Sequence, residues 1–314
     1  MKVVLLDVQT LGDDIDFSIF NKFGEVDIYT STPPEKVHER IKDADVIILN
    51  KVKINESNLA GTKVKLVCVT ATGYDNIDTA YCKENGIALY NVQGYSTDSV
   101  AQVTAALALS LYTRIKEYDK FVYDGKYSES DNPLGTKPVF YETAGKTWGI
   151  VGLGNIGKKV AEIAKALGCN VVVSSRTQKE GYENVTVDEL CQRADIISLH
   201  CPLNDESYHL IDGKRLSLMK KTAILVNVAR GAVVDEAAVT KAIKEKQIAG
   251  AAIDVYSKEP IEKTNPYNEI AGYDNVLLTP HMAWGAFESR TRCMNSVAKN
   301  IDAFLVGDAK NRIV

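Results

Sequence analysis

The chain of 314 residues has few cysteines and histidines, and their spacing excludes several kinds of site. Its six cysteines contain no C-x-x-C pair, so they offer neither the ligand spacing of a zinc site nor a disulfide framework. We expect no metal ion and a reducing, cytoplasmic location. The four histidines are His38, His200, His209 and His281. A mechanism that needs a histidine must therefore use one of these.

Charge of one sign and long apolar runs are also absent. Lys and Arg number 37 against 41 Asp and Glu, which gives a net charge of −4. A nucleic-acid-binding surface needs a basic excess, and a membrane span needs about 18–20 consecutive apolar residues. The N-terminal run MKVVLLD turns acidic without a cleavage site, so we expect a first strand there and no signal peptide. The sequence predicts neither nucleic acid nor a membrane as a partner.

Short apolar segments alternate with amphipathic ones along the chain, which is typical of parallel α/β sheets. Residues 98–119 are rich in Ala and Leu without Gly or Pro, and they predict one long buried helix. The tail 288–305 is helical and too short for a domain, so we expect it to pack on the first domain. The predicted strands are 2–7, 46–50 and 66–70 in the first domain, and 147–151, 170–174, 196–200, 224–228, 250–255 and 276–278 in the second.

The run GLGNIG, which begins at Gly152, has the spacing G-x-G-x-x-G. It follows a predicted strand, opens a predicted helix and lies within a βαβ unit, which together indicate a dinucleotide-binding turn. Gly152 permits the tight turn, Gly154 lets the backbone approach a pyrophosphate, and Gly157 allows close helix–strand packing. The backbone amides of Asn155 and Ile156 are expected to face the phosphates at the positive end of the helix.

The tip of the second strand in this βαβ unit bears on which dinucleotide binds. An NAD site usually places Asp or Glu there, whereas this chain has Ser175, Arg176 and Thr177, with Glu180 and Glu183 as the nearest acids. Arg176 could pair with a 2′-phosphate, and the two hydroxyls could donate to it. We expect NADP or NAD as cofactor, with a preference for NADPH. In the alternative, Arg176 stacks on the adenine and NADH is still accepted.

Three later segments place charged or polar residues just after predicted strands. NVARG ends with Arg230 and Gly231, DVYSKEP contains Asp254 and Glu259, and TPH ends with His281. Ligands of open α/β sheets bind outside the carboxyl ends of the strands. We therefore expect these side chains to converge beside the nicotinamide.

With the glycine-rich turn, these three runs in their order and spacing resemble the D-isomer-specific 2-hydroxyacid dehydrogenase family over nearly the whole sequence. The resemblance implies a catalytic triad of Arg230, Glu259 and His281. The planar fork of Arg230 would bind the substrate carboxylate and keto oxygen. His281 would protonate the carbonyl oxygen as hydride reaches the carbon, and Glu259 would hold the His281 tautomer and stabilise its charged form.

Other residues are expected to line the cofactor or substrate sites. Similar loops in the family hold the substrate carboxylate with backbone amides, and the run ATGYDNID after the strand at 66–70 matches them. A structural role explains Asp254 nearly as well as a cofactor contact does, and packing alone explains Thr104 equally well. The expected cofactor residues are also His200, Cys201, Pro202, Val228, Ala229, Asp254 and Thr104, and the expected substrate residues are Ala71, Thr72, Gly73, Tyr74, Arg230, His281 and Trp284.

The runs ATGYDNID and NVQGYSTDSVAQ, with Trp284 after the expected catalytic histidine, resemble the glycerate dehydrogenase (hydroxypyruvate reductase) branch. This resemblance implies NAD(P)H-dependent reduction of a small 2-oxo acid, hydroxypyruvate to D-glycerate or glyoxylate to glycolate. D-lactate, D-phenyllactate and branched D-2-hydroxy acids stay open as substrates. A cofactor-sensing, protein-binding module like the corepressors of this fold is another alternative, against which the lack of disordered or basic flanks weighs.

We therefore predict an α/β protein of two doubly wound parallel-sheet domains, a flavodoxin-like substrate domain and a Rossmann-type cofactor domain, with the active site in a cleft between them. The first domain comprises residues 1–98 plus 287–314, and the second comprises residues 99–286. The irregular segment 125–143 is too long for a plain loop, so we expect an arm over a partner or a domain junction. Aromatic side chains such as Tyr123 and Phe140 need cover. Together with the resemblance, they predict a homodimer.

Overall fold

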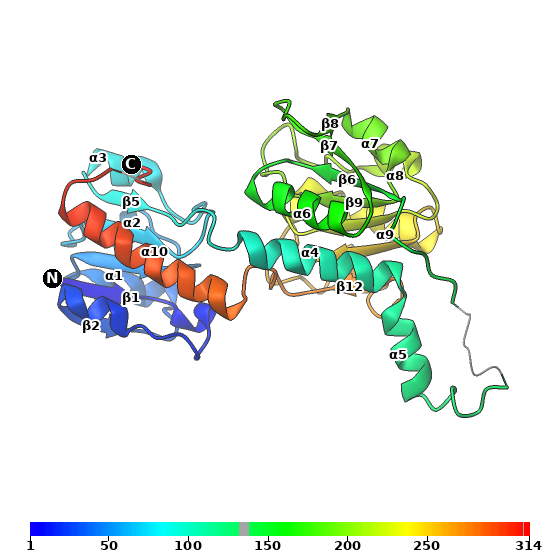
Figure 1. The fold of residues 1–314 in the computed structure, drawn as a ribbon. Coiled ribbons are helices and arrows are strands. Elements are labelled where there is room, and N and C mark those ends of the chain that lie inside the picture. The colour runs from blue at the N-terminus through cyan, green and yellow to red at the C-terminus, as the bar shows by residue number, and fades with distance from the viewer. Residues whose placement is uncertain (132–137, 310) are drawn as a thin grey trace. The chain divides into compact units, whose positions relative to one another are not determined.

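The computed structural model describes residues 1–131, 138–309 and 311–314 (Figure 1). They form two compact units, the first made of Met1–Ser96 with Trp284–Val314 and the second of Thr97–Ala283. These boundaries lie a few residues before the expected ones. Residues 132–137, part of the segment expected to contact a partner, lie outside the described residues.

The first unit is built on a five-stranded parallel sheet in the order β2-β1-β3-β4-β5, which is the flavodoxin-like order. Its strands are β1 (Lys2–Leu5), β2 (Glu25–Ile28), β3 (Val46–Leu49), β4 (Leu66–Val69) and β5 (Ala88–Tyr90). Its helices are η1 (Val8–Leu11), η2 (Ser18–Phe23), η3 (Pro34–Lys36), α1 (Val37–Ile41), α2 (Glu56–Leu59), α3 (Thr79–Glu84) and α10 (Phe287–Leu305).

Side chains of β1 alternate between two hydrophobic clusters on the two faces of this sheet. Val3 belongs to the cluster that includes Val297 of α10, and Val4 to the cluster that includes Ile41 of α1. Figure 1 shows α10 running along one face of the sheet. The last helix of the chain therefore completes the core of the first unit.

The second unit has a seven-stranded parallel sheet in the order β12-β11-β10-β9-β6-β7-β8. Six of these strands follow the Rossmann order, and β12 extends the edge. The strands are β6 (Thr147–Val151), β7 (Asn170–Ser174), β8 (Glu183–Asn184), β9 (Ile196–Leu199), β10 (Ile224–Asn227), β11 (Gly250–Ile253) and β12 (Val276–Leu278). The helices are α4 (Thr97–Tyr112), α5 (Ile115–Tyr123), α6 (Asn155–Ala166), α7 (Val187–Arg193), α8 (Gly213–Leu218), η4 (Gly231–Val233), α9 (Glu236–Lys244) and η5 (Pro266–Glu269).

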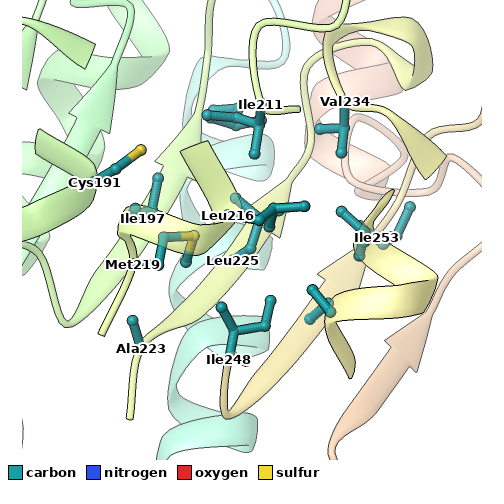
Figure 2. Packing of buried hydrophobic residues seen from close by; sticks show 14 of the residues in the cluster. Cys191, Ile197, Ile211, Leu216, Met219, Ala223, Leu225, Val234, Ile248 and Ile253 are labelled. Atoms are coloured by element: carbon teal, nitrogen blue, oxygen red, sulfur yellow. The ribbon is translucent and has the colours of Figure 1, made fainter. Parts of the chain in front are cut away.

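One face of this second sheet carries a large apolar cluster (Figure 2). Ile197, Leu225 and Ile253 project from the neighbouring strands β9, β10 and β11, and all three are fully buried. Leu216 of α8 packs against them. Continuous burial on β9, β10 and β11 is expected of parallel strands covered on both faces.

The predicted fold class is confirmed, since both sheets are parallel and doubly wound. The prediction of one helix over 98–119 is wrong, because the chain breaks at Arg114, whose φ of 58° is left-handed. After this break α5 contains no buried residue, whereas α4 is largely buried. The change of direction takes α5 away from the core, which a pattern of Ala and Leu does not reveal.

Candidate active site

The glycine-rich turn lies where the strand order of the second sheet reverses, between β6 and β9. Gly152 has a φ of 91°, and a Cβ atom there would lie 2.7 Å from the backbone N of Cys201. A Cβ atom on Gly157 would lie 2.1 Å from the backbone O of Gly152. Both positions therefore require glycine, one for its backbone angle and both for close packing.

The start of α6 is open toward solvent. A Cβ atom on Gly154 would meet nothing within 4 Å, and Gly154 caps the helix without a side-chain hydrogen bond. The first amides of a helix have no partner within the helix and attract anions. Asn155 is exposed and Ile156 half-buried at this end. The turn thus fits the pyrophosphate of a dinucleotide.

The tip of β7 holds the residues expected to select the cofactor. The Asn184 side-chain amide bridges the backbone of Ser175, accepting from its N–H at 3.0 Å and donating to its carbonyl at 3.0 Å. Arg176 is exposed and makes no hydrogen bond or ion pair within the described part of the protein. Glu183 is engaged by Arg193 through both carboxylate oxygens. Glu183, one of the two nearest acids, is therefore held by Arg193 and not by a residue of the tip.

His200 lies at the end of β9 in a buried series of hydrogen bonds. Trp148 Nε1 donates to Ser198 Oγ at 2.9 Å, and Ser198 Oγ lies 3.0 Å from His200 Nε2. Since the indole can only donate, the Ser198 hydroxyl proton can go to Nε2, which leaves the ring proton on Nδ1. Nδ1 is buried and has no hydrogen-bond partner among the described residues. Burial lowers the pKa of His200 to about 3, so the ring is neutral.

Arg230 follows β10 in a turn that is fixed from both sides. The fully buried amide group of Asn227 donates to the Arg230 carbonyl at 3.0 Å and accepts from the Ala229 N–H at 3.1 Å. A Cβ atom on Gly231 would lie 1.9 Å from the backbone C of Tyr256. The turn that carries Arg230 therefore packs closely against the loop that follows β11.

That loop carries Glu259, which meets His281 from the turn after β12. Glu259 Oε2 lies 2.7 Å from His281 Nδ1, and Glu259 Oε1 accepts from the Tyr256 N–H at 3.2 Å. Both side chains keep about three-tenths of their surface exposed, 30% for Glu259 and 29% for His281. A carboxylate on one ring nitrogen leaves Nε2 for a substrate, which is the arrangement of a general acid–base histidine.

Asp254 is fully buried between these two turns. Its Oδ1 accepts from Thr279 Oγ1 at 2.5 Å and from the Met282 N–H at 2.9 Å, and its Oδ2 accepts from the Ala283 N–H at 3.0 Å. The carboxylate thus binds the Thr279 side chain before His281 and the backbone directly after it. His281 itself has a left-handed φ of 54°. The structural role of Asp254 is visible directly, and a cofactor contact stays a prediction.

In the first unit, the loop after β4 presents backbone amides. The N–H groups of Thr72, Gly73 and Tyr74 donate to no other residue that the structure describes. The Thr72 hydroxyl donates to the Val92 carbonyl at 2.9 Å, and the side-chain amide of Asn91 donates to the Thr72 carbonyl at 2.7 Å. A loop held through its side chains and carbonyls keeps its amides available to an anion.

A second buried carboxylate shapes the neighbouring loop after β3. Asp7, only 6% exposed, accepts from the N–H groups of Asn50, Lys51 and Val52 at 2.8, 2.6 and 3.2 Å. Burial raises the pKa of Asp7 above its usual range, against the lowering effect of these amides. Asp7 was not among the expected site residues, although an acid at the end of the predicted strand 2–7 was a signal that could have found it.

The structure separates the remaining expected residues by environment. Thr104 is fully buried and its hydroxyl donates to the Val100 carbonyl at 2.7 Å, which matches the structural alternative. Trp284 belongs to the first unit, where its ring lies edge-on to Tyr95 with the centroids 6.5 Å apart. After β9, Cys201 and Pro202 follow His200 in the chain. After β10, Val228 and Ala229 are both buried.

Over residues 1–131, 138–309 and 311–314, no group of three or more His, Cys, Asp or Glu side chains is arranged to hold a metal ion. In the same ranges no helix combines the length and apolar character needed to cross a membrane.

The Rossmann sheet, the glycine-rich turn and the carboxylate–histidine pair define a nicotinamide-dependent dehydrogenase. Residues 105–283 match the family described as D-isomer specific 2-hydroxyacid dehydrogenase, NAD binding domain. The chain is 39% identical to a glyoxylate reductase of Thermococcus litoralis over 311 residues, 94% of this chain and 92% of that protein. It is 34% identical to a hydroxypyruvate reductase of Blautia hydrogenotrophica over 321 residues, 99% of each.

Two solved structures share the fold. A D-lactate dehydrogenase from Aquifex aeolicus, complexed with NAD and lactic acid, superposes with a TM-score of 0.86 at 30% identity, over 100% of this chain and 99% of that one. The acyclic imino acid reductase Bsp5, in complex with NADPH and D-Arg, gives a TM-score of 0.86 at 31% identity, over 100% of both chains.

The chain belongs to the D-isomer specific 2-hydroxyacid dehydrogenase family. It is an oxidoreductase with a nicotinamide cofactor, and the family acts on small 2-oxo and 2-hydroxy acids. The predictions of family, enzyme class and a nicotinamide cofactor are confirmed.

Proposed function

We propose that this enzyme reduces glyoxylate or hydroxypyruvate to the corresponding 2-hydroxy acid, glycolate or D-glycerate. The observation that carries the proposal is the 2.7 Å contact between Glu259 and His281 at the sheet edge that also carries Arg230. Relatives named glyoxylate reductase and hydroxypyruvate reductase support this substrate class.

The reduced nicotinamide supplies the hydride, and three side chains of this protein act on the 2-oxo acid. Arg230 binds the carboxylate and keto oxygen with two parallel N–H donors, a geometry that Lys cannot provide. His281 donates its Nε2 proton to the carbonyl oxygen, which becomes the hydroxyl of the product. Glu259 fixes the ring and balances its positive charge before the proton leaves.

The first unit also offers a binding site for the substrate carboxylate in this proposal. We assign its binding to residues 71–74, because Thr72, Gly73 and Tyr74 offer amides that no other described residue occupies. Backbone amides in a turn form an anion-binding concavity.

For the cofactor we propose a preference for NADPH. Arg176 is exposed without an ionic partner among the described residues, and Glu183, the carboxylate that could oppose a phosphate, is paired with Arg193. An arginine recognises the 2′-phosphate through charge-assisted hydrogen bonds. The turn at Gly152 and Gly154 and the unpartnered Nδ1 of His200 support binding of the dinucleotide at this edge.

The test is loss of reduced-nicotinamide absorbance with NADPH and NADH, each against glyoxylate, hydroxypyruvate, pyruvate and phenylpyruvate. We expect the fastest turnover with glyoxylate or hydroxypyruvate. A clear preference for pyruvate or phenylpyruvate would overturn the substrate assignment and favour D-lactate or D-phenyllactate chemistry. Silence on all four acids while NADPH binds would overturn the proposal and favour a cofactor-sensing, protein-binding role.

His281→Ala tests the chemistry itself. We expect at least about a hundredfold loss of kcat, the usual contribution of general acid–base catalysis, with NADPH affinity retained. Normal turnover with normal cofactor binding would remove His281 from the mechanism. His209→Ala is the matched control, since His209 stacks on Tyr208 with ring centroids 4.1 Å apart and has no carboxylate partner in the structure described.

We further propose a homodimer and a cytoplasmic location. Apolar side chains around α5 are exposed, among them Tyr123 at 89%, Val122 at 58% and Phe140 at 52%. Exposed apolar surface of this kind is typical of an interface. All six cysteines are free thiols, as expected in a reducing compartment. Light scattering that gave a monomer mass would end the dimer proposal.

A further inference from the structure

The loop that carries Glu259 has no regular secondary structure over residues 254–265. A loop of this length has many backbone conformations, and ordering each residue costs conformational entropy. The position of Glu259 opposite His281 therefore depends on whatever fixes the two ends of this loop.

One carboxylate, that of Glu236, contacts both ends. The N–H of Ser257 donates to Glu236 Oε1 at 2.8 Å, and the Ser257 hydroxyl donates to Oε2 at 2.8 Å. The Asn265 side-chain amide donates to Oε2 at 2.7 Å. Glu236 thus closes the span 257–265, and Glu259 lies inside that span.

Glu236 is itself held on a rigid element. It is the first residue of α9, whose N-cap Asp235 accepts from the Ala238 N–H at 3.0 Å. Val239 and Ile243 of the same helix are buried in the apolar cluster of the second unit. A carboxylate in the first turn is also favoured by the helix dipole. The loop is therefore tied to the core and not only to itself.

We propose that Glu236 is a positioning residue for the reaction, which holds the 257–265 span so that Glu259 meets His281. The inference rests on the proposed function, because it assigns Glu259 and His281 to catalysis. Glu236 does not touch the reacting atoms in this role and acts through Glu259.

Hydrogen-bond polarity gives a specific test. In Glu236→Gln, an NH₂ group replaces one oxygen and meets another donor in either orientation, the Ser257 N–H at the Oε1 place or the Asn265 NH₂ group at the Oε2 place. Asn265 cannot simply turn over, because its Oδ1 accepts from the Tyr267 N–H at 2.9 Å. In Glu236→Gln/Asn265→Asp the polarity is inverted, since the Gln amide donates to one Asp oxygen while the other still accepts from Tyr267. The total charge is unchanged.

We expect Glu236→Gln to lower kcat about tenfold with little change in the KM for NADPH, as for a hydrogen bond left without its partner. The inverted pair Glu236→Gln/Asn265→Asp should recover most of that loss. Glu269→Gln is the matched control, since it removes a carboxylate of the same unit that pairs at the surface with Lys244 at 2.7 Å. It should leave kcat unchanged.

A double-mutant cycle separates positioning from general stability. If Glu236 acts through Glu259, Glu236→Gln should change kcat less than about twofold in a Glu259→Gln background. An equal loss in both backgrounds would assign Glu236 a structural role only and overturn the inference. So would a normal kcat for Glu236→Gln.

The same set of variants distinguishes this inference from the proposed function. If the wild-type enzyme turns over and Glu259→Gln reduces kcat, the proposed function stands and the Glu236 variants decide the inference alone. If Glu259→Gln turns over normally, the catalytic assignment fails, and the inference about Glu236 fails with it. Thermal unfolding of each variant identifies any loss of activity that comes from unfolding.

Discussion

The Nδ1 atom of His281 lies 2.7 Å from the Oε2 atom of Glu259, although the two residues follow different strands, β12 and β11. Each is carried by a turn whose backbone is held by a buried or half-buried carboxylate. Asp254 binds the turn of His281, and Glu236 binds the loop of Glu259. The geometry of the pair is therefore set by two acids that need not touch a substrate.

Asp254→Asn should weaken both the fold and the activity. The new NH₂ group would face the N–H of Ala283 or the donors Thr279 and Met282, so one buried donor loses its acceptor. We expect the free energy of unfolding to fall by about 1–3 kcal/mol and kcat to fall at least about tenfold. Denaturant titration and steady-state kinetics measure the two effects.

The control for this change is Asp274→Asn, which alters an exposed acid of the same unit. We expect wild-type stability and turnover from it. If Asp254→Asn matched this control in both measurements, the carboxylate would have no part in holding the His281 turn.

Arg176→Ala should change the coenzyme ratio and nothing else. The guanidinium is exposed at the tip of β7, so its removal leaves the fold intact while a 2′-phosphate loses a charge-assisted partner. We expect KM for NADPH to rise about tenfold and KM for NADH to stay within about twofold. Gln178→Ala, two positions further along the same exposed tip, is the control. An unchanged ratio of the two KM values would assign Arg176 to adenine stacking.

His200 should make stability depend on pH between neutrality and pH 5. Burial lowers its pKa to about 3 in the folded state, while an unfolded chain has a histidine pKa near 6.5. As the pH falls below about 6.5, protons bind the unfolded state and not the native one, so stability is lost with falling pH. The linkage predicts a loss of about 2 kcal/mol from this group between pH 7 and pH 5.

His200→Gln removes this titration and keeps a polar group beside Ser198. Denaturant unfolding of cofactor-free protein at pH 7 and pH 5 should show a smaller pH effect for the variant by about that amount. Equal pH effects in the variant and the wild type would mean that the His200 ring takes up a proton as readily in the folded protein as in the unfolded one.

Gly231→Ala should be far more harmful than Gly213→Ala. The new Cβ atom would lie 1.9 Å from the backbone of Tyr256 in the first case and 3.9 Å from Ala238 Cβ in the second. Displacing backbone between the Arg230 turn and the Glu259 loop should cost several kcal/mol, whereas Ala in place of Gly at the start of α8 should stabilise by up to about 1 kcal/mol. Melting temperatures of the two variants test this, and a tolerated Gly231→Ala would show that the two turns are not packed together.

The sequence predicted most strands of the two sheets to within two residues. A buried parallel strand is a short run of apolar residues, so it can be recognised from its own segment alone. The glycine spacing from Gly152 to Gly157 was equally informative, since a side chain at Gly152 or Gly157 would collide with nearby backbone. Strands β2, β5 and β8 were missed, and all three lie at sheet edges. β2 and β8 have exposed residues and no continuous apolar run, whereas β5 is buried but only three residues long. Edge position is a property of the sheet and not of the segment.

Taken alone, the sequence determined the order of the elements, the family and the residues that follow each strand, because these depend on local pattern and chemistry. Only the tertiary structure decided that the long helix breaks at Arg114, that Asp254 binds the His281 turn and that Glu236 joins Ser257 to Asn265. The two carboxylate contacts depend on groups brought together by packing from distant parts of the protein. A pattern along the sequence carries no information on which of many polar groups will be paired once the core has formed.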